Sequence, residues 1–82
     1  IKNAKNPYYS SQFNAFHKYL LTKNAQKFIK DLIKILKTHY NSIDMFEVEY
    51  LHVLIAYHYK KLNMYKSAME YLEKLRELDF CE

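Results

Sequence analysis

The fold is decided by residues 49–78, which read EYLHVLIAYHYKKLNMYKSAMEYLEKLREL. Apolar residues recur at helical spacing on both sides of Asn63, a residue type that readily adopts the left-handed conformation at which helices end. Just upstream, Asp44 and Glu47 have the spacing of a capping box and mark a helix start. The sequence therefore predicts a hairpin of two helices, at about 45–62 and 64–78.

The two helices of this hairpin differ in their apolar faces. The helix at 45–62 is apolar almost all round, so we expect it to be covered on several sides. The helix at 64–78 is amphipathic, and the residues expected to point inward are Ala68, Tyr71, Leu72, Leu75 and Leu78.

Another hairpin is predicted upstream, over about 11–40. Ser10 or Ser11 can cap a helix at about 11–22, and Asn24 can cap one at about 25–40. The helix at 25–40 has the clearest amphipathic pattern in the chain, with a face made of Phe28, Ile29, Leu32, Ile33, Ile35 and Leu36. On the helix at 11–22, one apolar face is expected to consist of Phe13, Phe16 and Leu20.

Composition supports a helical protein. The chain has 82 residues, no glycine and one proline, Pro7. Its length allows one domain, and the lack of glycine argues against a sheet rich in tight turns. Residues 1–9 show no periodicity and are predicted to be a flexible leader. We therefore expect an all-α fold over residues 10–82, with antiparallel helical hairpins in a bundle of about four main helices.

Charge is distributed unevenly. Residues 1–40 hold eight lysines and one aspartate, a net +7, whereas residues 41–82 hold five basic and eight acidic groups, a net −3. One face of the helix at 25–40 is a candidate contact for an anionic membrane surface or an acidic partner, through Lys27, Lys30, Lys34 and Lys37. The alternative is an ordinary solvated face. Nucleic acid is a less favoured partner, because the single arginine, Arg76, lies in an acidic helix.

No catalytic or metal site is predicted. His52 and His58 are six residues apart, about 240° around a helix, so their side chains diverge. Four other residues could in principle act as metal ligands or nucleophiles, namely His17, His39, Ser67 and Cys81. None of them has a suitable partner residue at the required spacing. There is no glycine-rich phosphate loop. We expect no enzymatic activity and no cofactor.

The hairpin at 45–78 resembles the 34-residue tetratricopeptide repeat. With Glu49 as position one, the matching residues are Ile55, Ala56, Tyr59, Tyr65, Ala68, Leu72 and Leu75. The departures are His52 for the usual tryptophan, Asn63 for glycine and Phe80 for the closing proline. The resemblance implies that the two helices cross closely at Ala68.

Three stretches, taken in order, resemble the mitochondrial fission adaptors, which are small tail-anchored proteins with a two-repeat cytosolic domain. They are residues 10–13 (SSQF), 27–36 (KFIKDLIKIL) and 50–75, so the likeness covers residues 10–78. The chain departs from the family at Phe28, where a small residue is typical. Phe28 and Ala68 also lie about 40 residues apart instead of about 34. The family's first helix, closing helix and membrane tail are not visible.

The resemblance implies an adaptor that recruits a dynamin-related GTPase, directly or through another adaptor, to the mitochondrial or peroxisomal outer surface for fission. It implies the cytosolic face of the mitochondrial outer membrane if a tail anchor follows, and the cytoplasm otherwise. Inner helices of such repeats line a concave groove, which would be formed here by Tyr50, Val53, Tyr57 and Lys60. Such a groove suits a helix or extended peptide with an acidic group. Alternatively, Tyr50 and Tyr57 pack on other helices.

Two other functions remain open. One is a fragment of a general tetratricopeptide scaffold or peptide-binding protein, which further repeats in the reading frame would indicate. The other is a basic helical module that binds anionic lipid or nucleic acid, which strongly salt-dependent binding would indicate.

Overall fold

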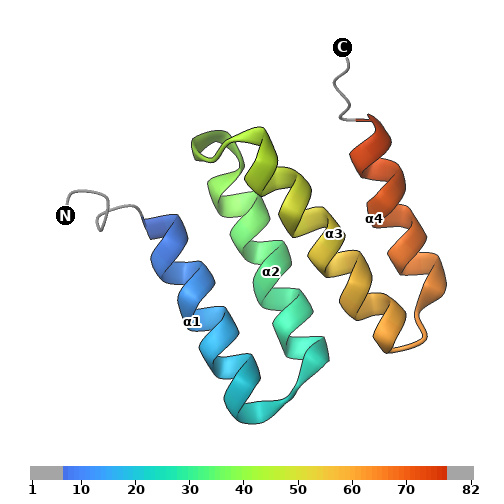
Figure 1. Ribbon diagram of the computed structural model, residues 1–82, viewed down its shortest axis with the longest axis horizontal. Coiled ribbons are helices and arrows are strands. Elements are labelled where there is room, and N and C mark those ends of the chain that lie inside the picture. Colours follow the sequence, from blue (N-terminus) through green and yellow to red (C-terminus); the bar gives the residue numbers. More distant parts are fainter. Residues whose placement is uncertain (1–6, 78–82) are drawn as a thin grey trace. The chain divides into compact units, whose positions relative to one another are not determined.

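Two antiparallel helical hairpins form residues 7–77, the part of the chain that this computed structural model describes (Figure 1). The chain divides into two compact units between residues 43 and 44. The elements are α1 (Pro7–Thr22), α2 (Ala25–His39), the short 3₁₀ helix η2 (Tyr40–Ser42), α3 (Met45–Lys61) and α4 (Tyr65–Glu77). Helices α1 and α2 form the first hairpin, and α3 and α4 the second. The described residues contain helices and turns without strands, which confirms the all-α prediction.

Helix α1 begins earlier than predicted, at Pro7. Proline suits the first turn of a helix, because its φ angle is already helical and its missing N–H has no partner to lose there. The next residue, Tyr8, is fully buried, and its ring meets that of His39 at 5.8 Å between centroids. Residues 7–9 therefore belong to the first hairpin, and the prediction of a leader over 1–9 is wrong for them. Residues 1–6 lie outside the described part.

An aromatic cluster joins α1 to α2. The ring of Phe28 stacks on Tyr19 with 4.5 Å between centroids and also contacts Phe16 at 5.2 Å. Phe28 is 2% exposed. The position where the resemblance places a small residue thus holds a large ring, and α1 supplies two aromatic rings against which it packs.

The predicted apolar face of α1 is only partly correct. Phe16 faces α2, but Phe13 is 68% exposed and Leu20 is 63% exposed. The buried small residue of this helix is Ala15. Helix α2 behaves as expected, with Phe28, Ile29, Leu32, Ile35 and Leu36 buried.

The starts of α2 and α3 follow their predicted capping residues, whereas Ser10 and Ser11, predicted to cap the first helix, lie inside α1. The Lys27 backbone N–H donates to Oδ1 of Asn24 at 3.1 Å, and the Glu47 N–H donates to Oδ1 of Asp44 at 3.0 Å. Asn63 has a φ of 64°, which confirms the left-handed turn after α3. Around it, the Met64 N–H donates to the Tyr59 carbonyl and the Asn63 N–H to the Lys60 carbonyl, both at 2.9 Å. This pair of bonds is a Schellman motif, which satisfies the last carbonyl groups of α3.

Helix α3 is less covered than its composition suggests. Its buried residues are Val48, Leu51, His52, Ile55, Ala56 and His58. A separate face remains open, with Phe46 80% exposed. On α4, Ala68 is buried as predicted, whereas Leu72 is exposed and Leu78 lies outside the described residues. The expectation that α3 is covered on several sides is therefore wrong for one face.

Within residues 7–77, no helix combines the length and the hydrophobicity that a bilayer-spanning segment needs.

Candidate binding groove

An apolar groove of about 400 Å³ runs between α3 and α4. Helix α3 contributes Val53, Ala56, Tyr57 and Lys60, and α4 contributes Tyr65, Ala68, Met69 and Leu72. Seven of these eight residues are apolar or aromatic, and Lys60 carries the only charge. The groove belongs entirely to the second hairpin.

Two alanines give the groove its depth. Ala56 and Ala68 are both buried, one on each helix, whereas the larger lining residues Val53, Tyr57 and Met69 are exposed. A methyl side chain permits helices to approach closely and leaves space above it that a larger side chain would fill. These are the same two small positions that the repeat pattern singled out in the sequence.

Tyr57 is held in place on the exposed face of α3. The Lys61 ammonium lies 5.5 Å from the centroid of its ring, within the range of a cation–π contact. The ring of His58 meets it edge-on at 5.1 Å. A ring restrained in this way loses little conformational freedom when a partner binds, which lowers the entropic cost of binding.

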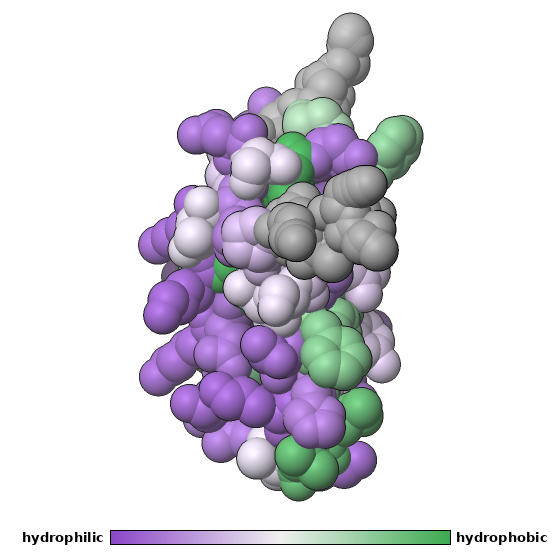
Figure 2. Space-filling view, turned by 90° about the vertical axis from the view of Figure 1, so that its left-hand side faces the viewer, coloured by the Kyte–Doolittle hydropathy of each residue, from purple (hydrophilic) through white to green (hydrophobic). Residues whose placement is uncertain are grey.

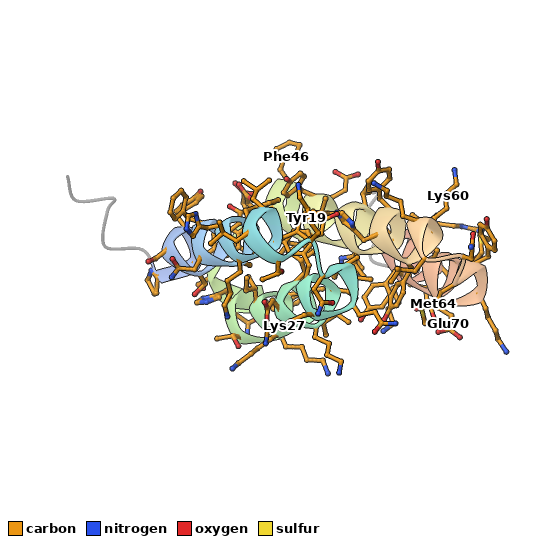
Figure 3. All side chains as sticks on the ribbon, turned by 90° about the horizontal axis from the view of Figure 1, so that it is seen from below. Tyr19, Lys27, Phe46, Lys60, Met64 and Glu70 are labelled. Carbon is orange, nitrogen blue, oxygen red and sulfur yellow. The ribbon has the colours of Figure 1, made fainter. Side chains whose placement is uncertain are left out.

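The groove continues as a stripe along α3. Phe46, Tyr50, Val53, Tyr57 and Lys60 follow one another at intervals of 4, 3, 4 and 3 residues, the spacing of a coiled-coil seam. Figure 3 shows Phe46 and Lys60 projecting from the same side of α3, near its two ends. At 1.5 Å per residue the stripe is about 21 Å long, or about four helical turns. We call these five residues the α3 stripe.

The charges around the α3 stripe differ between its ends. Glu49, which is exposed, lies beside Tyr50 near the start of the helix. Lys60 and Lys61, both exposed, lie at its end. A helix that lies along the stripe therefore meets a negative group near one end and two positive groups near the other.

Behind the stripe, buried polar and aromatic groups join α3 to α4. Nδ1 of His52 lies 2.9 Å from the Val48 carbonyl oxygen, so it donates its proton to that oxygen. The ring of Tyr71 on α4 contacts both His52 and Tyr59, at 5.8 and 5.9 Å. His52 is thus part of the core of the second hairpin.

Two groups in this hairpin have shifted pKa values. Burial raises the pKa of Tyr71 above its usual 10.0, with smaller contributions from Tyr59 and Glu70. Burial lowers the pKa of His58 below its usual 6.5, and the charge of Lys61 lowers it further. Both groups therefore favour their neutral forms in the folded protein.

The structure groups most of the residues predicted for the groove. Val53, Tyr57 and Lys60 line it, and Tyr50 is exposed on the same face of α3 outside its lining. Apart from Ala68, the residues that α4 contributes to the groove do not follow from the sequence pattern, and they are Tyr65, Met69 and Leu72. The apolar pattern of α4 placed Leu72 inward, and only the angle between the helices determines which α4 residues reach the rim.

The other candidate residues lie apart from the groove. Lys27, Lys30, Lys34 and Lys37 are all exposed on α2. His17 stacks on Phe13 in α1 with 6.1 Å between ring centroids. Among residues 7–77, no three His, Cys, Asp or Glu side chains gather into a group able to hold a metal ion. Cys81 lies outside that range.

Comparisons with protein-family models, with curated proteins and with solved structures give no match for this chain.

Proposed function

We propose that this protein is a protein-binding adaptor that uses the second hairpin to bind an amphipathic helix. The observation that carries the proposal is the apolar groove on Ala56 and Ala68, which opens onto the exposed α3 stripe. Grooves of this kind bind helices through apolar residues at i, i+3, i+4 and i+7. The length of the stripe suits a partner helix of about four turns.

Charge specifies the orientation of the partner helix. Its acidic end lies over Lys60 and Lys61, and its neutral or basic end lies over Glu49. The remainder of the surface is apolar, so burial supplies most of the affinity and the charged ends supply orientation.

We further propose that the partner is a dynamin-related GTPase, or an adaptor that carries it, at the outer surface of mitochondria or peroxisomes. The support for this setting is the resemblance of residues 10–78 to the mitochondrial fission adaptors. The mechanism is tethering, in which a fixed groove raises the local concentration of the partner at the membrane.

A designed peptide tests the groove itself. The probe is a fluorescein-labelled 14-residue helix with leucines at coiled-coil positions and glutamates at one end, and the readout is fluorescence anisotropy. We expect Tyr50→Ala combined with Tyr57→Ala to weaken binding at least about tenfold, because buried aromatic anchors dominate such interfaces. Tyr9→Ala combined with Tyr40→Ala is the matched control, since it removes two exposed tyrosines from the first hairpin. Equal affinities for the two double variants would reject the groove.

A charge swap tests the orientation. Lys60→Glu is expected to weaken binding of the glutamate-tailed peptide and to strengthen binding of a peptide with lysines in place of the glutamates. A loss of affinity for both peptides would indicate a folding defect, which circular dichroism detects.

Binding to a purified dynamin-related GTPase tests the proposal that this protein recruits such an enzyme. Binding that the Tyr50/Tyr57 double variant abolishes supports recruitment through the groove. If the designed peptide binds and the GTPase does not, the chain is a general helix-binding scaffold instead of a fission adaptor.

A further inference from the structure

The end of the first hairpin exposes an apolar pair next to basic residues. Leu20 and Leu21, in the last turn of α1, are 63% and 71% exposed. Lys18, Lys23 and Lys27 lie around them in the sequence and are also exposed. We call these five residues the hairpin tip. In Figure 2, which faces the α1 side of the molecule, hydrophobic surface interrupts a mostly hydrophilic face toward its lower edge.

The apolar surface extends from the tip along α1. Phe13 is exposed and precedes Leu20 by seven residues, so the two side chains lie on the same face of the helix. Tyr9, also exposed, continues that face toward the start of the helix. A solvent-facing helix surface normally carries charged groups, so this one has the composition of a contact surface.

Two backbone donors of the turn after α1 already have hydrogen-bond partners. The Lys23 N–H donates to the Tyr19 carbonyl at 2.7 Å, and the Asn24 N–H donates to Oγ1 of Thr22 at 3.2 Å. Oγ1 of Thr22 in turn donates to the Lys18 carbonyl at 2.9 Å. Because these groups are already bonded within the turn, moving the tip into a less polar medium does not strip those backbone donors of their partners.

The charge around the hairpin tip indicates what kind of surface the tip contacts. Residues 7–30 carry four lysines and no carboxylate, and the first acidic residue of the chain, Asp31, lines a pocket with Lys18 and Lys34, so lysines outnumber carboxylates here. Such a surface is complementary to an anionic one. Leu20 and Leu21 lie in the last turn of α1, outside the groove of the second hairpin, and an exposed apolar pair flanked by lysines suits the headgroup region of an anionic bilayer.

We propose that the hairpin tip is a membrane contact that inserts Leu20 and Leu21 into an anionic lipid surface, while Lys18, Lys23 and Lys27 bind the headgroups. Insertion of two leucines supplies the apolar part of the binding, and the three lysines supply the electrostatic part. The residues of this contact belong to the first hairpin and those of the groove belong to the second, so the two sites share no residue.

Vesicle co-sedimentation of the full chain tests the contact, with phosphatidylcholine vesicles that contain or lack phosphatidylserine. We expect binding only to the anionic vesicles and a decrease with added salt. Leu20→Ser combined with Leu21→Ser should lower the partition coefficient about tenfold or more. Replacing Lys18, Lys23 and Lys27 with alanine should lower it by roughly a hundredfold.

The matched control is the triple alanine variant at Lys30, Lys34 and Lys37, which makes the same change in net charge farther along α2. We expect a smaller loss than at the tip. Equal losses in the two triple variants, or full binding by the leucine double variant, would overturn insertion of the tip. Absence of binding to anionic vesicles by the unmodified chain would overturn the membrane contact, and concentration-dependent dimerisation that the leucine variant abolishes would assign the surface to a second copy.

Fluorescence gives a direct readout of insertion, because the chain contains no tryptophan. Leu21→Trp should show a blue-shifted emission when anionic vesicles are added. Asn41→Trp, at the other end of the same hairpin, should not shift. A blue shift at both positions, or at neither, would contradict a contact confined to the tip.

Discussion

The ring of Tyr19 in α1 lies almost parallel to the ring of Phe28 in α2, with 4.5 Å between the ring centroids and 14° between the ring planes. The pair, together with Phe16, joins the two helices of the first hairpin. In the second hairpin, two small buried residues, Ala56 and Ala68, line the groove between α3 and α4. The two hairpins therefore differ in the size of the side chains between their helices.

Phe28→Ala should unfold the first hairpin or weaken it severely. The ring is buried and has two aromatic partners, so its removal is expected to cost about 3–5 kcal/mol. Urea denaturation followed by circular dichroism measures the loss. The control is Phe13→Ala, which deletes the same atoms from an exposed position and should change stability by no more than about 0.5 kcal/mol. Similar losses in both variants would contradict the contacts described for Phe28.

Ala68→Leu should fill the bottom of the groove. The larger side chain occupies the space between α3 and α4, and we expect it to reduce stability by about 1–3 kcal/mol and to abolish binding of the designed peptide. Lys66→Leu adds a leucine to an exposed site on the same helix and should affect neither property strongly. Undiminished peptide binding by a folded Ala68→Leu protein would show that the partner does not reach the bottom of the groove.

Lys23→Gly should stabilise the first hairpin. Lys23 has a φ of 57°, a conformation that is unfavourable for residues with a Cβ atom and accessible to glycine. We expect a gain of about 0.5–1 kcal/mol in the free energy of unfolding. Lys30→Gly, in the interior of α2, should instead lower it by about 1 kcal/mol. A loss of stability in both variants would argue against relief of strain at Lys23.

Stability should fall as the pH drops through the range in which His58 titrates. The pKa of His58 is lowered by burial and by Lys61, so the unfolded chain binds a proton there at a higher pH than the folded chain does. This contribution is complete above the unfolded value of 6.5 and is lost as the pH decreases toward the folded value. The limiting slope is about 1.4 kcal/mol per pH unit.

The His58→Gln variant isolates this contribution from those of the other titrating groups. Its free energy of unfolding should depend less on pH than that of the unmodified chain between about pH 7 and 5. Identical pH profiles for the two proteins would show that the lowered pKa of His58 makes no contribution.

Most of the secondary structure is predictable from local chemistry. Asn24, Asp44 and Asn63 act where their side chains or backbone preferences place them, so the bounds of α2, α3 and α4 agree with prediction within one or two residues. The start of α1 is not evident from the sequence because Pro7 follows a polar segment without periodicity, although proline is common in the first turn of a helix. Its burial pattern is missed because this helix has apolar residues on more than one face.

The groove is predictable only in part, for a physical reason. The exposed residues of α3 follow from the position of Ala68 in the repeat pattern, which places Val53, Tyr57 and Lys60 on the open side. Tyr65, Met69 and Leu72 reach the rim because of the angle at which α4 crosses α3, and no residue of α4 encodes that angle by itself. The sequence likewise contains the hairpin tip, but only the fold shows that Leu20 and Leu21 are exposed.

Ala56 and Ala68, at the bottom of the groove, tolerate substitution less well than the residues at its rim. Any enlargement at Ala56 or Ala68 disturbs the approach of two helices, whereas changes at Val53, Met69 or Leu72 alter only the rim. Descendants of this protein that acquire new partners should therefore vary at the rim and inherit the two methyl groups beneath it.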